Sequence, residues 1–290
     1  MPKHPIRAIG IVVKRDRPEA VELGKTLTGW LRERRKKVFG EPSAAEAMGA
    51  EPVSHDDLAH RADLVVVLGG DGTLLGIARK VGRRETPILG INLGGLGFLT
   101  EASINEARQA LERVLDGEYE TDRRITLEAE VLRGSGSSVE VVHHFLAVND
   151  AVLNKGPLGR MMELAVTADG ERFCEYRADG LIVSTPTGST AYALSAGGPI
   201  VFPSLGVLVL APICPHTLSN RPVVLPDSFE IEVRVKTPDH DSTILTIDGQ
   251  ETAQLSDDHY VRIRRGRYAV VLIRSPHPYF EIWRDKLHWG

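Results

Sequence analysis

The residue with the clearest chemical potential is a carboxylate set among glycines. Asp71 belongs to the motif GGDGT at residues 69–73, which follows the apolar run LVVVL at 64–68 and leads into a helix-like stretch at 73–82. Backbone N–H groups at the start of a helix suit phosphate oxygens. A carboxylate there repels phosphate unless a metal ion or a reacting proton lies between them. Asp71 is therefore a candidate for phosphate chemistry, although an Asp that only caps the helix would occupy the same place.

Two further polar side chains interrupt an apolar strand. Asn149 and Asp150 lie in the middle of FLAVNDAVL at residues 145–153. Burying an unpaired carboxylate costs several kcal/mol, so Asp150 needs partners. The alternative is a bulge or strand end where both side chains reach solvent.

A third segment combines charge with hydroxyl groups. Arg177 and Asp179 precede a short strand at 181–183, and a Pro-Thr-Gly turn then leads into a hydroxyl-rich helix start. Such a start offers backbone and side-chain donors to a sugar or phosphate, and the ring of Tyr192 offers a stacking surface. An ordinary Ser- or Thr-capped helix has the same pattern. The glycine-rich turn at 94–97 allows close approach of a ligand, but it is a weak dinucleotide signal by itself.

The elements that position these residues change character along the chain. The first part alternates strands at 6–13, 64–68 and 88–91 with helices at 19–37, 56–60, 73–82 and 103–115, the last capped by Ser103. This alternation predicts a parallel sheet covered by helices. Ligands of such sheets bind at the carboxyl ends of the strands, and both glycine-rich turns lie there.

The second part predicts a mostly β domain. Short strands are expected at 126–132, 144–153, 163–167, 229–235, 243–247 and 268–273, with a hairpin turn at 168–170 and one helix at 189–196. The aromatic tail from 279 is helical again and is expected to dock on the first domain. The predicted domains are residues 1–122 with the tail 276–290, and residues 123–275.

Composition limits the classes of function. The chain has 290 residues with 42% hydrophobic and 26% charged residues, which is ordinary for a globular protein. A net charge of −4 gives no general field for nucleic acid, and the basic run at 32–37 is interpreted as a solvated helix end. No apolar run is long enough for a membrane span, and no signal peptide is recognisable. Cys174 and Cys214 match no metal spacing and are expected to be buried thiols in a reducing cytoplasm.

Taken together, these segments resemble bacterial NAD kinase. GGDGT, NLGGLGFLTE at 92–101, the Asn149-Asp150 pair, DGLIVSTPTGSTAY at 179–192 and SAGGP at 195–199 occur in that order. PICPHTLSNRP at 212–222 and IDGQ at 247–250 agree with it. GGDGT alone is shared with lipid kinases, whereas its combination with TPTGSTAY is highly specific.

The resemblance implies an ATP:NAD 2′-phosphotransferase. It implies an α/β N-terminal domain, a β-sandwich C-terminal domain that binds NAD and a tail that returns to the first domain. Asp71 would be the catalytic base, and Mg²⁺ would be carried by the nucleotide rather than by a metal site of the protein. The implied NAD contacts are Asp71, Gly72, Asn149, Asp150, Arg160, Arg177, Asp179, Thr190, Ala191, Tyr192, Ser195 and Gln250. The phosphate-donor region would comprise Gly69, Gly70, Gly72, Thr73, Gly94 and Gly95. Asp150 stands where many family members carry Glu.

The expected partners are small-molecule nucleotides and further copies of the chain, as a homodimer or homotetramer, with no nucleic acid and no membrane. The expected location is the cytoplasm. Two alternatives stay open at this point. A lipid or sphingoid-base kinase would share GGDGT but would leave the hydroxyl-rich turn unexplained. A non-catalytic NAD(H)-binding regulator would bind NAD without turnover in the presence of ATP and Mg²⁺.

Overall fold

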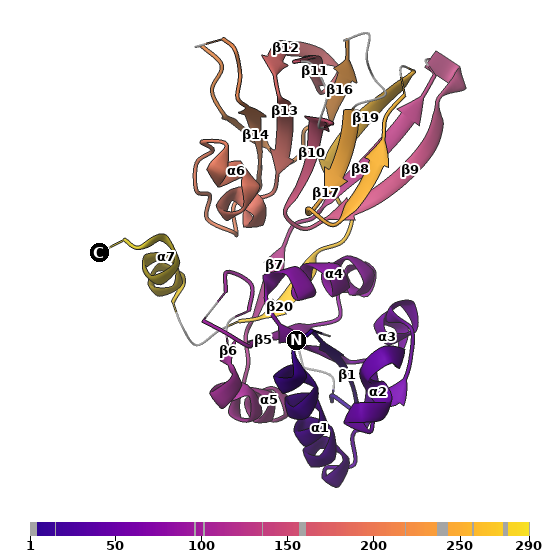
Figure 1. Cartoon of the computed structure of the whole chain (residues 1–290), viewed down its shortest axis with the longest axis vertical. Helices are drawn as coiled ribbons and strands as arrows, with labels where there is room; N and C mark the ends of the chain where they lie inside the picture. Colours follow the sequence, from indigo (N-terminus) through magenta and orange to yellow (C-terminus); the bar gives the residue numbers. More distant parts are fainter. Residues whose placement is uncertain are drawn as a thin grey trace. The chain divides into compact units, whose positions relative to one another are not determined.

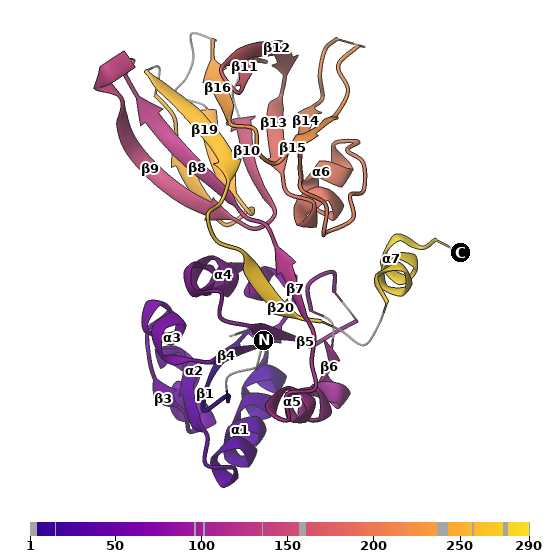
Figure 2. The ribbon, with the colours of Figure 1, turned by 180° about the vertical axis from the view of Figure 1, so that it is seen from behind.

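The chain folds into two compact units. The computed structural model describes residues 5–14, 16–95, 97–100, 102–134, 136–156, 161–217, 219–236, 243–256, 258–274 and 278–289. One unit comprises Met1–Arg123 with Tyr268–Gly290, and the other comprises Arg124–Arg267 (Figures 1 and 2). Each unit has its own hydrophobic core.

The first unit is built on one eight-stranded sheet. Its strands are β1 (Ala8–Val13), β2 (Lys37–Gly40), β3 (Glu51–Pro52), β4 (Leu64–Gly69), β5 (Ile88–Asn92), β6 (Ala102–Ser103), β7 (Thr121–Arg124) and β20 (Val270–Ile273). Their order is β3-β2-β1-β4-β5-β20-β7, and β6 pairs with β5. The central strands β1, β4 and β5 pair in parallel. Every residue of β1 and β4 is buried, as expected for a parallel sheet covered on both faces.

Helices cover both faces of this sheet. The helices that cover it are α1 (Pro18–Glu33), α2 (Pro42–Met48), α3 (His55–Arg61), α4 (Asp71–Val81) and α5 (Ala107–Leu115). The unit also contains the C-terminal helix α7 (Tyr279–Leu287) and the 3₁₀ turns η1 (Gly82–Arg84) and η2 (Ile104–Glu106). Helices α1, α2 and α5 share one core with alternate residues of β1 and β4. Leu58 of α3 and Leu74 of α4 pack instead on the glycines of β1 and β5. The predicted α/β architecture is confirmed (Figure 1).

The first unit differs from the sequence prediction in several details, and α2, β3, β6 and β7 were not predicted. Helix α1 ends at Glu33 rather than near residue 37, and the following residues form β2, which was not predicted. Strand β20 was assigned to the β-rich domain but lies between β5 and β7. All four residues of β20, VVLI, are buried. Such a run suits a sheet with both faces covered, whereas a sandwich strand alternates.

The second unit is a β-sandwich, as predicted. One six-stranded antiparallel sheet has the order β15-β14-β13-β10-β17-β18 and the other β12-β11-β16-β19-β8-β9. Their strands are β8 (Leu127–Arg133), β9 (Glu140–Ala147), β10 (Asp150–Lys155), β11 (Met162–Ala168), β12 (Glu171–Ala178), β13 (Gly180–Ser184), β14 (Val207–Ile213), β15 (Val223–Pro226), β16 (Ile231–Val235), β17 (Thr243–Ile247), β18 (Glu251–Gln254) and β19 (His259–Arg265). Residues from the inner faces of both sheets form one core. The short turns η3 (Gly136–Ser138), η4 (Thr187–Thr190) and helix α6 (Tyr192–Ser195) interrupt the strands.

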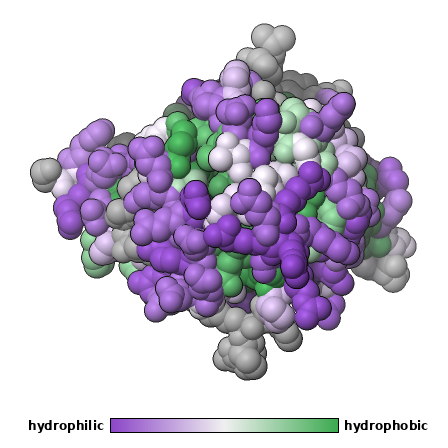
Figure 3. Space-filling model, turned by 90° about the horizontal axis from the view of Figure 1, so that it is seen from below, coloured by the Kyte–Doolittle hydropathy of each residue, from purple (hydrophilic) through white to green (hydrophobic). Residues whose placement is uncertain are grey.

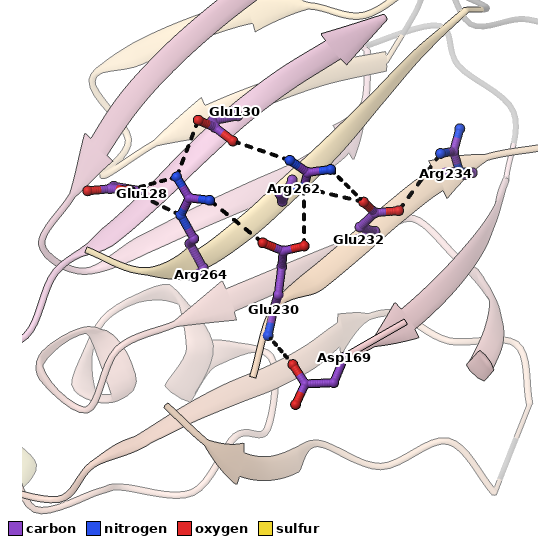
Figure 4. A network of polar contacts seen from close by, with 8 residues as sticks. All are labelled: Glu128, Glu130, Asp169, Glu230, Glu232, Arg234, Arg262 and Arg264. Carbon is purple, nitrogen blue, oxygen red and sulfur yellow. Dashed lines mark hydrogen bonds and ion pairs between the residues drawn. The ribbon is translucent and has the colours of Figure 1, made fainter. Parts of the chain in front are cut away.

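The outer face of the second sheet carries a network of ion pairs (Figure 4). Alternate residues of β8, β16 and β19 are buried in the core, so the residues between them point outward. Arg262 pairs with Glu232 at 3.1 Å and with Glu230 at 3.3 Å, and Arg264 pairs with Glu128 at 3.2 Å. These cross-strand pairs stabilise the register of the three strands.

The predicted hairpin turn is present, but one of the two cysteines is more exposed than predicted. The predicted hairpin turn joins β11 to β12, with Asp169 at φ +50° and Gly170 at φ +78°, the conformation that an Asp-Gly hairpin turn requires. Cys174 is half-buried, but Cys214 is exposed, so the prediction of two buried thiols is wrong for Cys214. Cys214 falls in the loop after β14 rather than in the strand.

The C-terminal helix belongs to the first unit, as predicted. The Tyr279 hydroxyl donates a hydrogen bond to Asp122 Oδ2. Lys286 Nζ lies 3.8 Å from the position that a Cβ would occupy at Gly95. None of the helices in the described ranges is both long enough and apolar enough to cross a membrane. The face in Figure 3 is mostly hydrophilic, and hydrophobic residues reach it only in small areas.

Candidate functional site

Asp71 is the first residue of α4 rather than its cap. Gly70 occupies the N-cap position, and no side chain caps this helix. The alternative in which Asp71 serves only to cap the helix is therefore wrong. The carboxylate instead reaches across to the turn that follows β5.

Four hydrogen bonds hold the Asp71 carboxylate. Oδ1 accepts from the Leu99 N–H at 3.1 Å, from the Thr100 N–H at 3.1 Å and from the Thr100 hydroxyl at 3.0 Å. Among the described residues, Oδ2 accepts from the Phe98 N–H alone, at 2.9 Å. Each carboxylate oxygen offers about two lone-pair sites. The remaining acceptor capacity of this half-buried side chain is therefore on Oδ2.

The turn after β5 is shaped to receive this carboxylate. A Cβ at position 97 would overlap Asp71 Oδ1 and the Thr100 hydroxyl, so Gly97 provides the space. Asn92 donates from Nδ2 to the Thr100 hydroxyl at 2.7 Å, and its Oδ1 accepts from the Gly94 N–H at 3.0 Å. Thr100 is completely buried. Asn92 and Thr100 thus fix the two glycine-rich turns against each other.

The predicted phosphate-donor residues gather at one edge of the first sheet. Gly69 at the end of β4 pairs with Asn92 at the end of β5. The residues of this region are Gly69, which is buried, Gly70 and Thr73, which are half-buried, and Gly72, Gly94 and Gly95, which are exposed. An exposed glycine backbone beside a helix start suits phosphate oxygens.

In the second unit, Asn149 and Asp150 lie at a break between two strands. The sequence predicted one strand over 144–153, but β9 ends at Ala147 and β10 begins at Asp150. The Asp248 carboxylate holds this break, because it accepts hydrogen bonds from three consecutive backbone N–H groups. These donors are Val148 at 3.0 Å, Asn149 at 2.8 Å and Asp150 at 3.1 Å. The backbone N–H of Asp248 in turn donates to the Asp150 carbonyl oxygen at 3.0 Å.

At this break the Asp150 side chain is buried and Asn149 is half-buried, in contrast to the solvent-facing alternative. Asp150 is 4% exposed. Burial, reinforced by the negative charge of Asp248, raises the pKa of Asp150 to about 7. Asn149 Oδ1 is buried and accepts no hydrogen bond within the described residues. Unsatisfied polar atoms of this kind are costly for the fold, and they make Asn149 a candidate ligand contact.

The hydroxyl-rich turn after β13 uses most of its hydroxyls internally. The Thr185 hydroxyl donates to the Val148 carbonyl oxygen at 2.7 Å, and the Ser184 hydroxyl donates to that of Asn149 at 3.1 Å. Both side chains are completely buried. Gly188 is required here because a Cβ would overlap the Asn149 carbonyl oxygen. The turn therefore braces the Asn149-Asp150 break.

The helix predicted over 189–196 is interrupted. Turn η4 ends at Thr190, Ala191 adopts φ −98° and ψ −129°, and α6 has four residues. The expected backbone anion site at a helix start is therefore absent from this described segment. The accessible side chains are half-buried Thr190, exposed Ser195 and Tyr192, which is 45% exposed.

The strand register decides which predicted NAD contacts share a neighbourhood. Asp150 pairs with Ser184, and Ala151 pairs with Ile247. Asn149, Asp150 and Gln250 therefore lie at one end of their sheet, with the segment from Thr190 to Ser195 just beyond β13. Gln250 is exposed in the hairpin turn that contains Asp248.

Asp179 lies at the opposite end of that sheet, and Arg177 lies two residues earlier in β12 of the other sheet. Asp179 precedes β13 and pairs through Oδ1 with Lys155 Nζ at 2.6 Å, at the far end of β10 from Asp150. Five strand residues separate these ends by about 17 Å. Arg177 pairs with Glu163 at 3.2 Å. Arg160 lies outside the described residues.

Sequence reasoning missed three positioning residues, Asn92, Thr100 and Asp248. All three stand within segments that carried the family resemblance, and each is a polar residue at the end of an apolar run. Their partners are 8 to 100 residues away along the chain. Within the described ranges, no three His, Cys, Asp or Glu side chains are grouped so that they could hold a metal ion.

Comparisons with known proteins agree with this arrangement. The family model described as ATP-NAD kinase N-terminal domain matches residues 9–119, and that of the ATP-NAD kinase C-terminal domain matches residues 148–275. A protein from Syntrophotalea carbinolica named NAD kinase is 44% identical over 288 residues, which cover 98% of this chain and 99% of the relative. One from Solibacter usitatus with the same name is 45% identical and covers 98% of both chains.

Solved structures show the same fold. A crystal structure of yeast NADH kinase complexed with NADH has a TM-score of 0.90 at 27% identity, covering 99% of this chain and 89% of that chain. An NAD kinase from Archaeoglobus fulgidus in complex with ATP has a TM-score of 0.77 at 26% identity, covering 98% of this chain and 100% of that chain.

Proposed function

The chain belongs to the ATP-NAD kinase family, and from that premise we propose how its own residues carry out the reaction. The enzyme is an NAD kinase, which transfers the terminal phosphoryl group of ATP to the 2′-OH of the adenosine ribose of NAD. The observation that supports our assignment of Asp71 is the one-sided hydrogen bonding of its carboxylate.

We propose that Asp71 Oδ2 accepts the proton of the 2′-OH. Oδ1 is saturated by three donors, which fixes the carboxylate plane and leaves Oδ2 as the acceptor. A carboxylate is too weak a base to ionise a sugar hydroxyl before reaction. It receives the proton as the oxygen–phosphorus bond forms, in a loose transition state of the kind described for kinases. The exposed glycines after β4 and β5 would bind the phosphates of the donor.

The NAD contacts are assigned to the second unit. Asp150 in its ionised form would accept hydrogen bonds from ribose hydroxyls, and Asn149 Oδ1 would gain the donor that it lacks. The side chains of Thr190, Tyr192, Ser195 and Gln250 are accessible near the same end of the sheet. Binding of NAD would thus satisfy Asn149 Oδ1, a buried atom with no partner among the described residues.

Asp179 and Asp150 of one chain cannot hold the same ribose diol, because about 17 Å of strand separates them. We propose that the enzyme is a homo-oligomer in which the Arg177–Asp179 end of one copy contacts the NAD held by Asn149 and Asp150 of another. Such sharing is a common use of symmetric interfaces.

The proposal assigns the metal to the nucleotide. The described residues form no cage of ligands for it, and Mg²⁺ usually binds nucleotide phosphates through few protein groups. Its chemistry would be charge neutralisation on the donor phosphates. ATP and NAD are cytoplasmic metabolites, and we place the enzyme in the same compartment.

The Asp71→Asn variant tests the proton-acceptor role. The amide keeps the shape of the carboxylate, so the variant should fold and bind NAD, while kcat for NADP formation falls at least about 10²-fold. Calorimetry with NAD and a coupled NADP assay measure the two quantities. Near-normal kcat would remove Asp71 from this role. Wild-type protein that binds NAD without turnover would support the regulator alternative, and phosphorylation of diacylglycerol in preference to NAD would support the lipid-kinase alternative.

A further inference from the structure

A strongly basic pocket lies at the edge of the first sheet where β1 and β2 begin. Its volume is about 520 Å³. No acidic residue of the described chain lines it, and its cationic lining residues are Arg7, Arg34, Arg35, Lys36, Lys37 and Arg61. The run at 32–37 was interpreted from the sequence as a solvated helix end. Folding adds Arg7 from the start of β1 and Arg61 from the end of α3.

Half of these cations have structural partners that hold them in place. The partners are Trp30 and Glu112 for Arg34, the Ile6 carbonyl oxygen for Lys36, and Glu51 and Phe39 for Arg61. The salt bridges and stacked rings fix the walls of the pocket.

The side chains of the other half have no partner within the described residues, although the Asp63 carboxylate accepts hydrogen bonds from the backbone N–H groups of Arg7 at 2.8 Å and Ala8 at 2.9 Å. The side chains of Arg7, Arg35 and Lys37 are exposed. The Lys37 N–H donates to the Arg7 carbonyl oxygen at 3.0 Å, so the two residues are neighbours at this edge of the sheet. Like charges so placed repel, and a bound anion would relieve that repulsion.

Arg35 occupies a position where glycine is the favoured residue. The Lys36 N–H donates to the Leu31 carbonyl oxygen at 3.0 Å and the Arg35 N–H to that of Arg32 at 2.8 Å, which is the Schellman ending of a helix. The residue at this point adopts the left-handed conformation, here with φ +57°. Glycine takes this conformation without steric cost. Helix ending alone therefore does not account for an arginine at this position.

The chemistry of the lining selects a class of ligand. The volume is that of a small-molecule site, and arginine guanidinium groups match phosphate oxygens in paired hydrogen bonds. The aromatic lining residue, Phe39, is 2% exposed beneath Arg61, so it offers no face to a base. We propose that this pocket binds an oligophosphate chain, either free or as the triphosphate of a nucleotide.

This pocket is distinct from the candidate catalytic site. Asp71 and the glycine-rich turns follow the carboxyl ends of β4 and β5, whereas the pocket lies where β1 and β2 begin. The length of the parallel strands, roughly 17 Å, separates the two edges. The inference does not depend on the assignment of Asp71.

Calorimetric titration with inorganic tripolyphosphate at physiological ionic strength tests the proposal. The pocket variant combines Arg7→Gln, Arg35→Gly and Lys37→Gln. The matched control combines Lys25→Gln, Lys80→Gln and Arg83→Gln, which removes the same charge from exposed positions of the same unit. The candidate catalytic site can also bind a phosphate chain. We therefore assign to the pocket only the tripolyphosphate binding that the pocket variant loses and the control keeps. We expect its affinity to fall at least tenfold in that variant and to stay within twofold in the control.

Equal binding by the three proteins, equal losses in both variants, or no binding to the wild type would overturn the proposal. Titrations with ATP and adenosine identify the source. If ATP also binds in a way that only the pocket variant loses, nucleotides are among the ligands of the pocket. If only tripolyphosphate binds in this way, the ligand is a free phosphate chain. A pocket-dependent event with adenosine would contradict recognition through phosphate.

The single variant Arg35→Gly guards against a folding defect. Its thermal midpoint should equal or exceed that of the wild type, because glycine suits the left-handed position. Its affinity for tripolyphosphate should still fall severalfold. Unchanged affinity in this stable variant would remove Arg35 from the site. NADP formation with Asp71 intact reports separately on the proposed catalytic function.

Discussion

Asp150 is expected to destabilise the protein above neutral pH. Burial, and after it the charge of Asp248, raises the pKa of this carboxyl from 3.8 to about 7 in the folded protein. Below pH 4 the carboxyl is protonated in both folded and unfolded chains. Between pH 4 and 7 only the folded chain holds the proton, so stability falls as pH rises, by about 1.4 kcal/mol per pH unit. Over these roughly three units the loss is about 4 kcal/mol.

The Asp150→Asn variant removes this titration and keeps the shape of the side chain. Relative to the wild type, its free energy of unfolding should therefore rise by about 3 kcal/mol between pH 5 and pH 8. All other titrating groups are common to both proteins and cancel in the difference. The KM for NAD should rise at least tenfold, because the neutral amide cannot replace an ionised acceptor.

Urea denaturation followed by far-UV circular dichroism measures this difference. Tryptophan fluorescence is unsuitable because Trp30, Trp283 and Trp289 all belong to the first unit. The companion variant Asp248→Asn removes the second cause of the raised pKa. Its pH dependence should shrink without vanishing, since burial is the larger cause. A difference between wild type and Asp150→Asn that is constant from pH 5 to pH 8 would refute the reasoning.

Two further predictions follow from the geometry. Gly97→Ala should displace the Asp71 carboxylate, lowering kcat by about 10-fold or more and the free energy of unfolding by about 1–3 kcal/mol. Steady-state kinetics and thermal denaturation measure the two effects, with Gly29→Ala as the control because its Cβ meets open space. Unchanged kcat in Gly97→Ala would contradict the role of Gly97. Asp150→Asn and Asp179→Asn proteins, mixed under subunit exchange at an NAD concentration where each alone turns over slowly, should regain wild-type activity at about a quarter of the sites of a dimer. No recovery despite demonstrated exchange would rule out sharing of the site between copies.

The NAD-binding role proposed for Asp150 would explain a carboxylate at this position despite its cost to stability. A neutral residue at this position would give a more stable sandwich at pH 8. Active sites commonly retain such local destabilisation because it leaves polar groups ready for the ligand. The pKa near 7 also makes NAD affinity sensitive to pH, with tighter binding expected as Asp150 ionises.

The sequence by itself determined the class of the fold and predicted Asp71 as the main candidate for the chemistry. Buried runs such as LVVVL and the helix-like stretch after GGDGT depend on side-chain periodicity within about ten residues. That signal is local, so β1, β4, α4 and the Asp-Gly hairpin were predicted close to their observed bounds. The motif order identified the family because its residues are read directly from the chain.

Only the tertiary structure decided which distant residues act together. The Asp248 carboxylate accepts hydrogen bonds from the backbone of residues 148–150. Strand β20 joins the first sheet, although the strands that precede it in the sequence belong to the β-sandwich. Arg7, Arg35 and Arg61 meet in one pocket, whereas Asp150 and Asp179 are held apart. Strand pairing and register set the distances between these residues through hydrogen bonds between segments far apart in sequence. The hydrophobic periodicity of a segment does not predict which distant segment it pairs with.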